Sequence, residues 1–253
     1  MHRTPLSSAI LAVAVFTATT LAMTGLARAG DGSVVSWGAE FDTNARYLWR
    51  GIECDHGPVF QPSAWMSAGR YTLSAWSSLS NHQEIGPSAC KELDLTFQAD
   101  LGNEMIGIQP SFLYYHYYYD GVTPSTGEMS LRISRSIGSF EAYTAQTFDV
   151  VRYGGSYFGE TGVDFESKIV RGRCGLSAAL STGWGSRRFN DVYIGASKTA
   201  LNLAASSIGV RFPAEGNAYV RAHVEAAAIL DPAIRSALGS TPSNAGIAMG
   251  IEF

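Results

Sequence analysis

The sequence predicts an all-β protein, a transmembrane antiparallel up-and-down β-barrel of 12 strands. Three observations predict this fold. Apolar and polar residues alternate along repeated segments of about ten residues, which is typical of strands with one lipid face and one polar face. Short and long connections alternate between these segments. Beyond the N-terminal segment, no apolar run approaches the roughly 18 residues of a membrane-spanning helix. The mean hydropathy of +0.03 fits a barrel, whose hydrophobicity lies on every second residue.

Residues 1–29 have the features of a cleaved secretory signal. A basic start at Arg3 precedes an apolar run, and the segment ends in Ala27-Arg28-Ala29, a small-x-small cleavage pattern. We therefore assign residues 30–253 to one barrel domain. The chain has 18 Lys and Arg against 22 Asp and Glu, and the signal holds two of the basic residues and no acid. The remaining excess of acids argues against a nucleic-acid partner.

The first predicted strand, Val35 to Gly51, sets the pattern for the others. Its odd positions are nearly all apolar or aromatic, as at Trp37 and Phe41, whereas its even positions are mostly polar, as at Glu40. Successive side chains of a strand point to opposite faces, so one face is apolar and the other charged. The same alternation predicts the other eleven strands at 60–68, 71–80, 92–101, 106–118, 129–137, 140–150, 161–169, 174–184, 203–212, 218–229 and 245–253.

The connections between these strands fall into two classes that alternate without exception. The short ones are 69–70, 102–104, 138–139, 170–172 and 213–217, and the long ones are 51–58, 81–91, 119–127, 151–159, 185–202 and 230–244. Short periplasmic turns and long extracellular loops are typical of outer-membrane barrels. Residues 191–195 could form a further strand, but thirteen strands would break the even number expected, so we interpret 185–202 as a loop. One helical turn is expected at 232–237.

A periplasmic β-sandwich or a lipocalin-like barrel is the soluble alternative. Its apolar face would point inward and its polar face outward. The apolar face of the predicted strands is interrupted only by Arg135, which lies near a short turn and can extend toward water. This pattern favours a membrane barrel with lipid as its surroundings. The last strand ends at the aromatic Phe253 and in this resembles the C-terminal segments that the barrel-assembly machinery reads. This resemblance implies that machinery as a partner.

Two stretches of the first predicted hairpin carry a family resemblance. Residues 44–52 (Asn-Ala-Arg-Tyr-Leu-Trp-Arg-Gly-Ile) and 57–62 (Gly-Pro-Val-Phe-Gln-Pro) resemble the first hairpin of the TorF-type porin family of Gram-negative bacteria. Residues 190–195 and 228–231 are similar to later segments of that family. The resemblance implies an outer-membrane β-barrel and carries over no catalytic residue.

The polar face of each strand defines the predicted lumen. Its acids are Glu40, Asp42, Glu92, Asp94, Asp100, Glu128, Glu141, Asp149, Asp164, Glu166, Glu225 and Glu252, its bases are Arg46, Arg50, Arg132, Lys168, Arg173, Arg211 and Arg221, and Asn44, Gln98 and His223 lie on the same face. Acids outnumber bases, which predicts a mildly acidic, weakly cation-preferring lumen. Alternatively, these charges pair across strands and fill a plugged barrel with a structural or partner-binding role.

An outer-membrane hydrolase is the enzymatic alternative. It would need a nucleophile and a base at one level of the wall, and only His223 near Glu225, with Ser207 on the preceding strand, offers such a pair. A single luminal histidine is more often a structural hydrogen-bonding group. Trp65, Trp76 and Tyr115 also point inward by parity, either to stack a solute or to pack.

Three cysteines remain in a chain expected to be exported, where disulfides form. Cys54 and Cys90 fall in the first two long loops on the same side, so we predict a disulfide between them. Cys174 is expected at the opposite rim. Their spacing matches no metal site, and no cofactor is expected. The sequence as a whole predicts a narrow porin-like channel for small hydrophilic solutes in the bacterial outer membrane.

Overall fold

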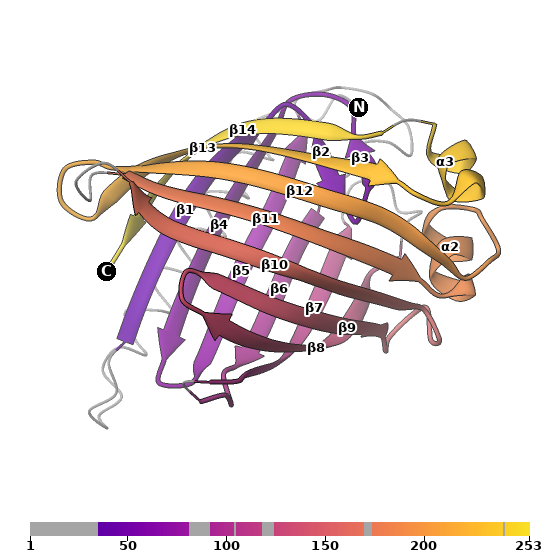
Figure 1. Cartoon of the computed structure of the whole chain (residues 1–253), viewed down its shortest axis with the longest axis horizontal. Helices are drawn as coiled ribbons and strands as arrows, with labels where there is room; N and C mark the ends of the chain where they lie inside the picture. Colours follow the sequence, from indigo (N-terminus) through magenta and orange to yellow (C-terminus); the bar gives the residue numbers. More distant parts are fainter. Residues whose placement is uncertain (1–34, 81–91, 104, 118–123, 170–173, 240) are drawn as a thin grey trace, which may run out of the picture.

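Twelve antiparallel strands close into one barrel in the computed structural model, which describes residues 35–80, 92–103, 105–117, 124–169, 174–239 and 241–253. The first and last strands pair with each other, so the barrel has no free edge. The predicted 12-stranded barrel is confirmed (Figure 1). The barrel strands are β1 Val35–Asn44, β4 Val59–Ala68, β5 Tyr71–Ser80, β6 Glu92–Ala99, β7 Gly107–Tyr117, β8 Thr126–Ile137, β9 Phe140–Asp149, β10 Tyr157–Ile169, β11 Cys174–Gly185, β12 Ala200–Pro213, β13 Ala218–Ile229 and β14 Ser243–Glu252.

The two ends of the barrel differ. Figure 1 shows the helices α2 (Arg187–Tyr193) and α3 (Pro232–Leu238) at one end, which we call the helix end. The opposite end, which we call the turn end, carries the tight turns at 69–70 and 138–139. Strand β1 begins and β14 ends at the turn end, where Trp37 stacks on Phe253 with ring centroids 4.3 Å apart.

The predicted first strand, Val35 to Gly51, is wrong beyond Asn44. β1 ends there, and the chain forms a separate hairpin of β2 (Tyr47–Trp49) and β3 (Ile52–Asp55). Arg50 and Gly51 at its tip have φ values of 51° and 79°, and positive φ at both central residues is the geometry of a type I′ turn. A left-handed arginine carries strain of about 1 to 3 kcal/mol, which surrounding contacts must offset.

The long connection after β11 contains a helix and no strand. Ser186 caps α2 by accepting a hydrogen bond from the Phe189 N–H at 3.2 Å, and β12 begins at Ala200, earlier than predicted. The helical turn expected at 232–237 is confirmed as α3, with Asp231 as its N-cap and Gly239 at its C-terminus. Neither of these described helices is long and apolar enough to cross a membrane.

Side chains alternate between an exposed apolar belt and a polar interior, as the sequence predicts. In β8, Met129, Leu131 and Ile133 are exposed on the outer surface, whereas Glu128 and Arg132 point inward. A cluster of buried hydrophobic side chains lies at the helix end. There, side chains from α2, α3 and the ends of β10, β12 and β13 pack together, namely Phe158, Phe189, Ala200, Leu203, Ile229 and Ile234.

Candidate functional site

The hairpin β2–β3 crosses the interior of the barrel. Near its base, the Tyr47 ring packs on Trp76 of β5, with centroids 5.3 Å apart, and its hydroxyl donates to Glu92 of β6 at 2.9 Å. At its tip, a Cβ on Gly51 would lie 2.8 Å from the side chain of Leu203 in β12. Contacts to strands on both sides of the barrel require the hairpin to span the lumen.

Arg50 fastens the hairpin tip to the barrel wall. Its guanidinium donates two hydrogen bonds to the Glu128 carboxylate, at 2.8 and 2.7 Å. The guanidinium also lies over the rings of Trp49 and Phe158, at 4.6 and 4.9 Å from their centroids. Tyr115 donates its hydroxyl proton to the same carboxylate at 2.7 Å. These charge-assisted hydrogen bonds and cation–π contacts hold Arg50 in its strained backbone conformation.

The lumen beside β5 to β8 is filled near the helix end. Trp49 packs edge-on against Tyr115, and Glu92 and Glu128 are each only 2% exposed. Burial and the nearby Glu92 raise the pKa of Tyr47 well above its ordinary value, so its phenol stays protonated and donates to that acid. Of the inward aromatics that the sequence predicts, Trp76 and Tyr115 therefore pack against the hairpin.

Trp65, the third inward aromatic, packs on β1. A Cβ at Gly38 would lie 2.3 Å from the Trp65 ring, so glycine is required at that position for the ring to cross the neighbouring strand.

Glu40, Asp42, Arg221 and His223, all predicted in the lumen, form one network between β1 and β13. Arg221 donates to Glu40 at 2.6 Å and to Asp42 at 3.4 Å, and His223 Nε2 lies 3.0 Å from Asp42. Tyr219 donates to Glu40 at 2.8 Å. The acids of the first strand thus share Arg221 as a cationic partner, and Asp42 also faces His223.

A second network lies on the wall formed by β8 to β10. Arg132 donates to Glu141 at 2.6 Å and to Asp164 at 2.8 Å, and its guanidinium lies 3.7 Å from the centroid of the Tyr143 ring.

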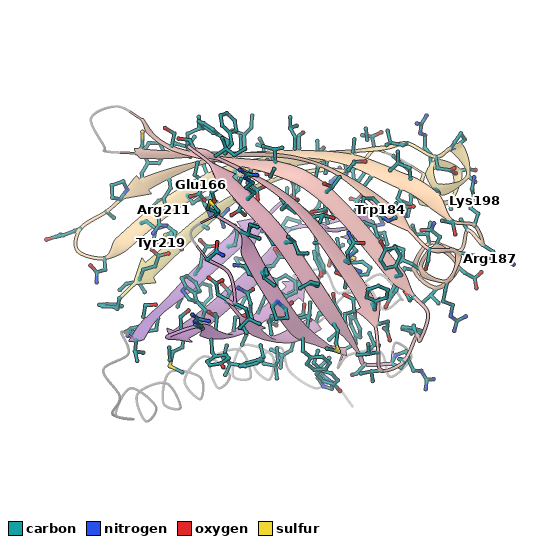
Figure 2. The ribbon with its side chains drawn as sticks, turned by 60° about the horizontal axis from the view of Figure 1, so that its bottom comes forward. Glu166, Trp184, Arg187, Lys198, Arg211 and Tyr219 are labelled. Atoms are coloured by element: carbon teal, nitrogen blue, oxygen red, sulfur yellow. The ribbon has the colours of Figure 1, made fainter. Side chains whose placement is uncertain are left out.

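At the turn end, Arg211 pairs with Glu252 at 2.6 Å. Figure 2 places Arg211 and Tyr219 toward this end together with Glu166, another predicted luminal residue, which is exposed.

Amide side chains line the wall where β1 meets β4 and β14. Asn44 donates to Gln61 at 2.8 Å and accepts from Asn244 at 2.7 Å, and Asn244 also donates to Glu225 at 3.0 Å. Asn44 is 3% exposed. The alternation in the sequence predicts Asn44 and Glu225 as luminal, but Asn244 falls in the predicted loop 230–244 and so carries no predicted direction. Gln61 shares the inward parity of Trp65, which is the signal that could have found it.

Arg46, Gln98 and Lys168 are further residues that the sequence predicts in the lumen. Arg46 stands in the bend after β1, half-exposed, and pairs with Glu53 of the hairpin at 3.1 Å, because the first strand ends before it. Gln98 of β6 lies on the same face as Asp94, one of whose carboxylate oxygens is buried without a hydrogen-bond partner among the described residues. The side chain of Lys168 falls outside the described part of the chain.

Two cavities remain along the wall formed by β11 to β13. The one nearer the helix end has a volume of about 210 Å³ and lies between the hairpin tip, at Arg50 and Gly51, and the wall residue Glu160. The other has about 280 Å³ and is lined by Asp42 and His223 among other polar groups. Both are lined by Ser207 and Glu225, so they adjoin at this pair.

Small side chains create this space. Small residues at the inward positions of β11 to β13 line the cavities beside the larger Leu203, Arg221, His223 and Glu225, namely Ser177, Ala179, Ser181, Ala205, Ser207 and Ala227. These two cavities therefore lie on the side of β11 to β13, across the barrel from the aromatic side chains of β5 and β7 that pack on the hairpin. Glu160 lies outside the strand predicted at 161–169, whereas β10 begins at Tyr157 and includes it. The parity it shares with Asp164 and Glu166 is the signal that could have found it.

The structure brings His223, Asp42 and Ser207 to one cavity without forming a hydrolytic triad. His223 Nε2 faces Asp42, and no hydrogen bond joins His223 to Ser207 among the described residues. Within the same described part of the chain, no three His, Cys, Asp or Glu side chains are placed to hold a metal ion.

Comparison with known proteins shows the fold. The NanC porin superposes with a TM-score of 0.56 at 7% identity, covering 84% of this chain and 98% of that one. The KdgM porin, solved in complex with disordered oligogalacturonate, has a TM-score of 0.49 at 8% identity, with 86% and 98% covered. The translocator domain of the autotransporter NalP from Neisseria meningitidis has 0.48 at 11%, with 98% and 97% covered. No protein-family model matches the chain, and no curated protein matches it.

Proposed function

We propose that this protein is a narrow outer-membrane channel for small hydrophilic solutes, with a mildly acidic lumen and a mouth constricted by the hairpin β2–β3. The observation that carries the proposal is the hairpin itself, which spans a closed polar barrel yet leaves two adjoining cavities beside its tip. A chain that only filled its lumen would not need small side chains along one wall. The proposal assigns no catalytic residue and no cofactor.

The surroundings follow from the outer surface. An exposed apolar belt on a closed barrel suits lipid, and the polar face lies inside. We place the turn end in the periplasm and the helix end outside the cell, because outer-membrane barrels have short turns on the periplasmic side and longer loops on the extracellular side. We further propose that residues 1–29 are a secretory signal and that the barrel-assembly machinery binds the strand that ends at Phe253. The protein is proposed to be a member of the TorF-type porins.

Single-channel conductance in a planar bilayer tests the channel. Asn44 lies opposite Val59 across β1 and β4, so residues 46–57 can be replaced by a short Gly-Ser linker without shifting either strand. The native protein should give small unitary currents, and the hairpin-deleted variant larger ones. Both should migrate faster on SDS gels unboiled than boiled, which shows a folded barrel.

The alternative of a plugged barrel gives different results. A folded native protein without conductance, together with a conducting deletion variant, would make the hairpin a permanent plug and the barrel structural or partner-binding. If both proteins are folded and neither conducts, the channel proposal is wrong.

A further inference from the structure

We infer that Glu225, opposite Ser207 at the junction of the two cavities, is the cation-selecting site of this lumen, and that it takes small monovalent cations or the ammonium group of a small hydrophilic solute. The inference rests on the proposed channel. It identifies the class of solute and the residue that selects it. The overall charge of the lumen predicts only a preference for cations.

The arginines that line the cavities form ion pairs, whereas the acid Glu225 does not in the described part of the chain. Arg50 and Arg221 both line this space, but Arg50 is bound by Glu128, and Arg221 by Glu40 and Asp42. Within the described residues, Glu225 forms no ion pair. Glu225 accepts a hydrogen bond from the neutral side-chain amide of Asn244.

Glu160, across the cavity nearer the helix end, resembles Glu225 in this respect. It accepts a hydrogen bond from the Tyr143 hydroxyl and, within the described residues, has no cationic partner. Glu225 and Glu160 are therefore the carboxylates along the free space that face no cation within the described residues. Glu40 and Asp42, on the first strand, share Arg221, and Asp42 also faces His223.

Geometry makes Glu225 the decisive position. Ser207 lies directly opposite Glu225 in the β12–β13 register, and both residues line both cavities, so a solute that passes from one cavity to the other passes this pair. A carboxylate in a confined path attracts cations and repels anions more strongly than it would in open water. The hydroxyl of Ser207 can accept or donate a hydrogen bond, which suits a hydrated ion or an ammonium N–H.

The lining excludes other solute classes. An anion would need an uncommitted guanidinium, and both arginines beside the cavities are bound to acids. Pockets for large apolar ligands are lined mainly by hydrophobic and aromatic side chains, and no Phe, Tyr or Trp that the structure describes lines either cavity. Small cationic solutes fit the charge of this space.

The test is the reversal potential of the channel in a potassium chloride gradient. The native protein should be cation-selective, and Glu225→Gln, which keeps the hydrogen bond with Asn244 available, should move the reversal potential toward zero. Glu160→Gln should move it in the same direction. Glu215→Gln removes the same charge from the exposed β12–β13 turn and should leave the potential unchanged.

A second variant does not depend on how Glu225→Gln folds. Ser207→Lys places a cation opposite Glu225 and should weaken or reverse the cation preference.

A second measurement on the native protein replaces potassium by methylammonium on one side of the membrane, to distinguish an inorganic cation from an organic ammonium group as the preferred solute. A preference for methylammonium indicates an organic ammonium solute, and a preference for potassium indicates an inorganic ion.

The outcomes separate this inference from the channel proposal. If the native protein conducts but is anion-selective, or if Glu225→Gln and Ser207→Lys both keep native selectivity, Glu225 is not the selecting site and the channel proposal stands. If the folded native protein does not conduct, both are overturned.

Discussion

Arg50 and Glu128 join the tip of an inserted hairpin to the wall of the barrel through two hydrogen bonds of 2.8 and 2.7 Å. The Glu128 side chain is 3% exposed and that of Arg50 15%, so the pair is shielded from water. Removing one partner leaves a buried charge without compensation, which is the costly way to break such a pair.

The variant Arg50→Ala should therefore destabilise the protein by about 3 to 5 kcal/mol and increase current fluctuations as the hairpin loosens. Arg46→Ala is the matched control, because Arg46 forms a half-exposed pair with Glu53 of the same hairpin. Its cost should be about 0 to 1 kcal/mol. Urea unfolding followed by tryptophan fluorescence measures both, and equal effects would show that the Arg50 pair does not hold the hairpin.

The amide network between β1, β4 and β14 should contribute to stability in proportion to the hydrogen bonds it satisfies. Asn44→Ala removes two hydrogen bonds: the Gln61 side-chain oxygen loses its donor, and Asn244 loses one acceptor but keeps its bond to Glu225. The unpaired Gln61 oxygen should cost about 1 to 3 kcal/mol. The temperature at which the fast-migrating gel band is lost should fall. Asn217→Ala, in an exposed turn, should leave that temperature unchanged.

The disulfide between Cys54 and Cys90 stays a prediction, since Cys90 lies outside the described residues. Cys54 lies on β3 toward the helix end, whereas Cys174 begins β11 at the turn end, opposite Ile169. An unreduced digest should contain linked Cys54 and Cys90 peptides, and Cys54→Ser should cost about 3 to 4 kcal/mol in the chain-entropy account. Alkylated Cys54, or a Cys54–Cys174 peptide, would contradict the prediction.

The cap of α3 should weaken in acid. Asp231 pairs with Lys198 at 2.7 Å and accepts from the Ala233 N–H at 2.9 Å, and these hydrogen bonds, Lys198 first, lower its pKa below the ordinary 3.8. A lowered folded-state pKa stabilises the fold above the unfolded pKa, and this contribution is lost as pH falls through the folded value.

Hydrogen exchange of peptides covering α3, corrected for intrinsic rates, should therefore accelerate below pH 3.8. Asp231→Asn should lose this pH dependence while keeping the cap, since asparagine also caps helices. Persistence of the same acid response in the variant would assign it to another group.

The sequence was sufficient for the strand count, the two classes of connection and the inward parity of Asp42, Arg132 and Glu225, because a period of two leaves little choice once one face meets lipid. It was not sufficient for the hairpin. Tyr47 and Trp49 continue the apolar alternation of β1, yet they pack on aromatic residues inside the lumen and not on lipid.

Length was the available signal for the hairpin. A tilted membrane strand needs about 9 to 11 residues, whereas the predicted one had more than sixteen and contained Arg50-Gly51, a two-residue turn. The pairing of Glu40 with Arg221 could not be read from the sequence, because it joins strands at opposite ends of the chain.

The amide pair Asn44–Asn244 joins residues 200 positions apart, at the seam where β14 pairs with β1 and closes the barrel. Closing so long a loop costs little more entropy than closing one of half the length, but the search for the partner strand is slow. A slip of one residue would turn Asn244 toward lipid and Ile247 into the lumen, and the amides would lose their partners. The amide pair therefore makes the correct register of the seam lower in free energy than a register shifted by one residue.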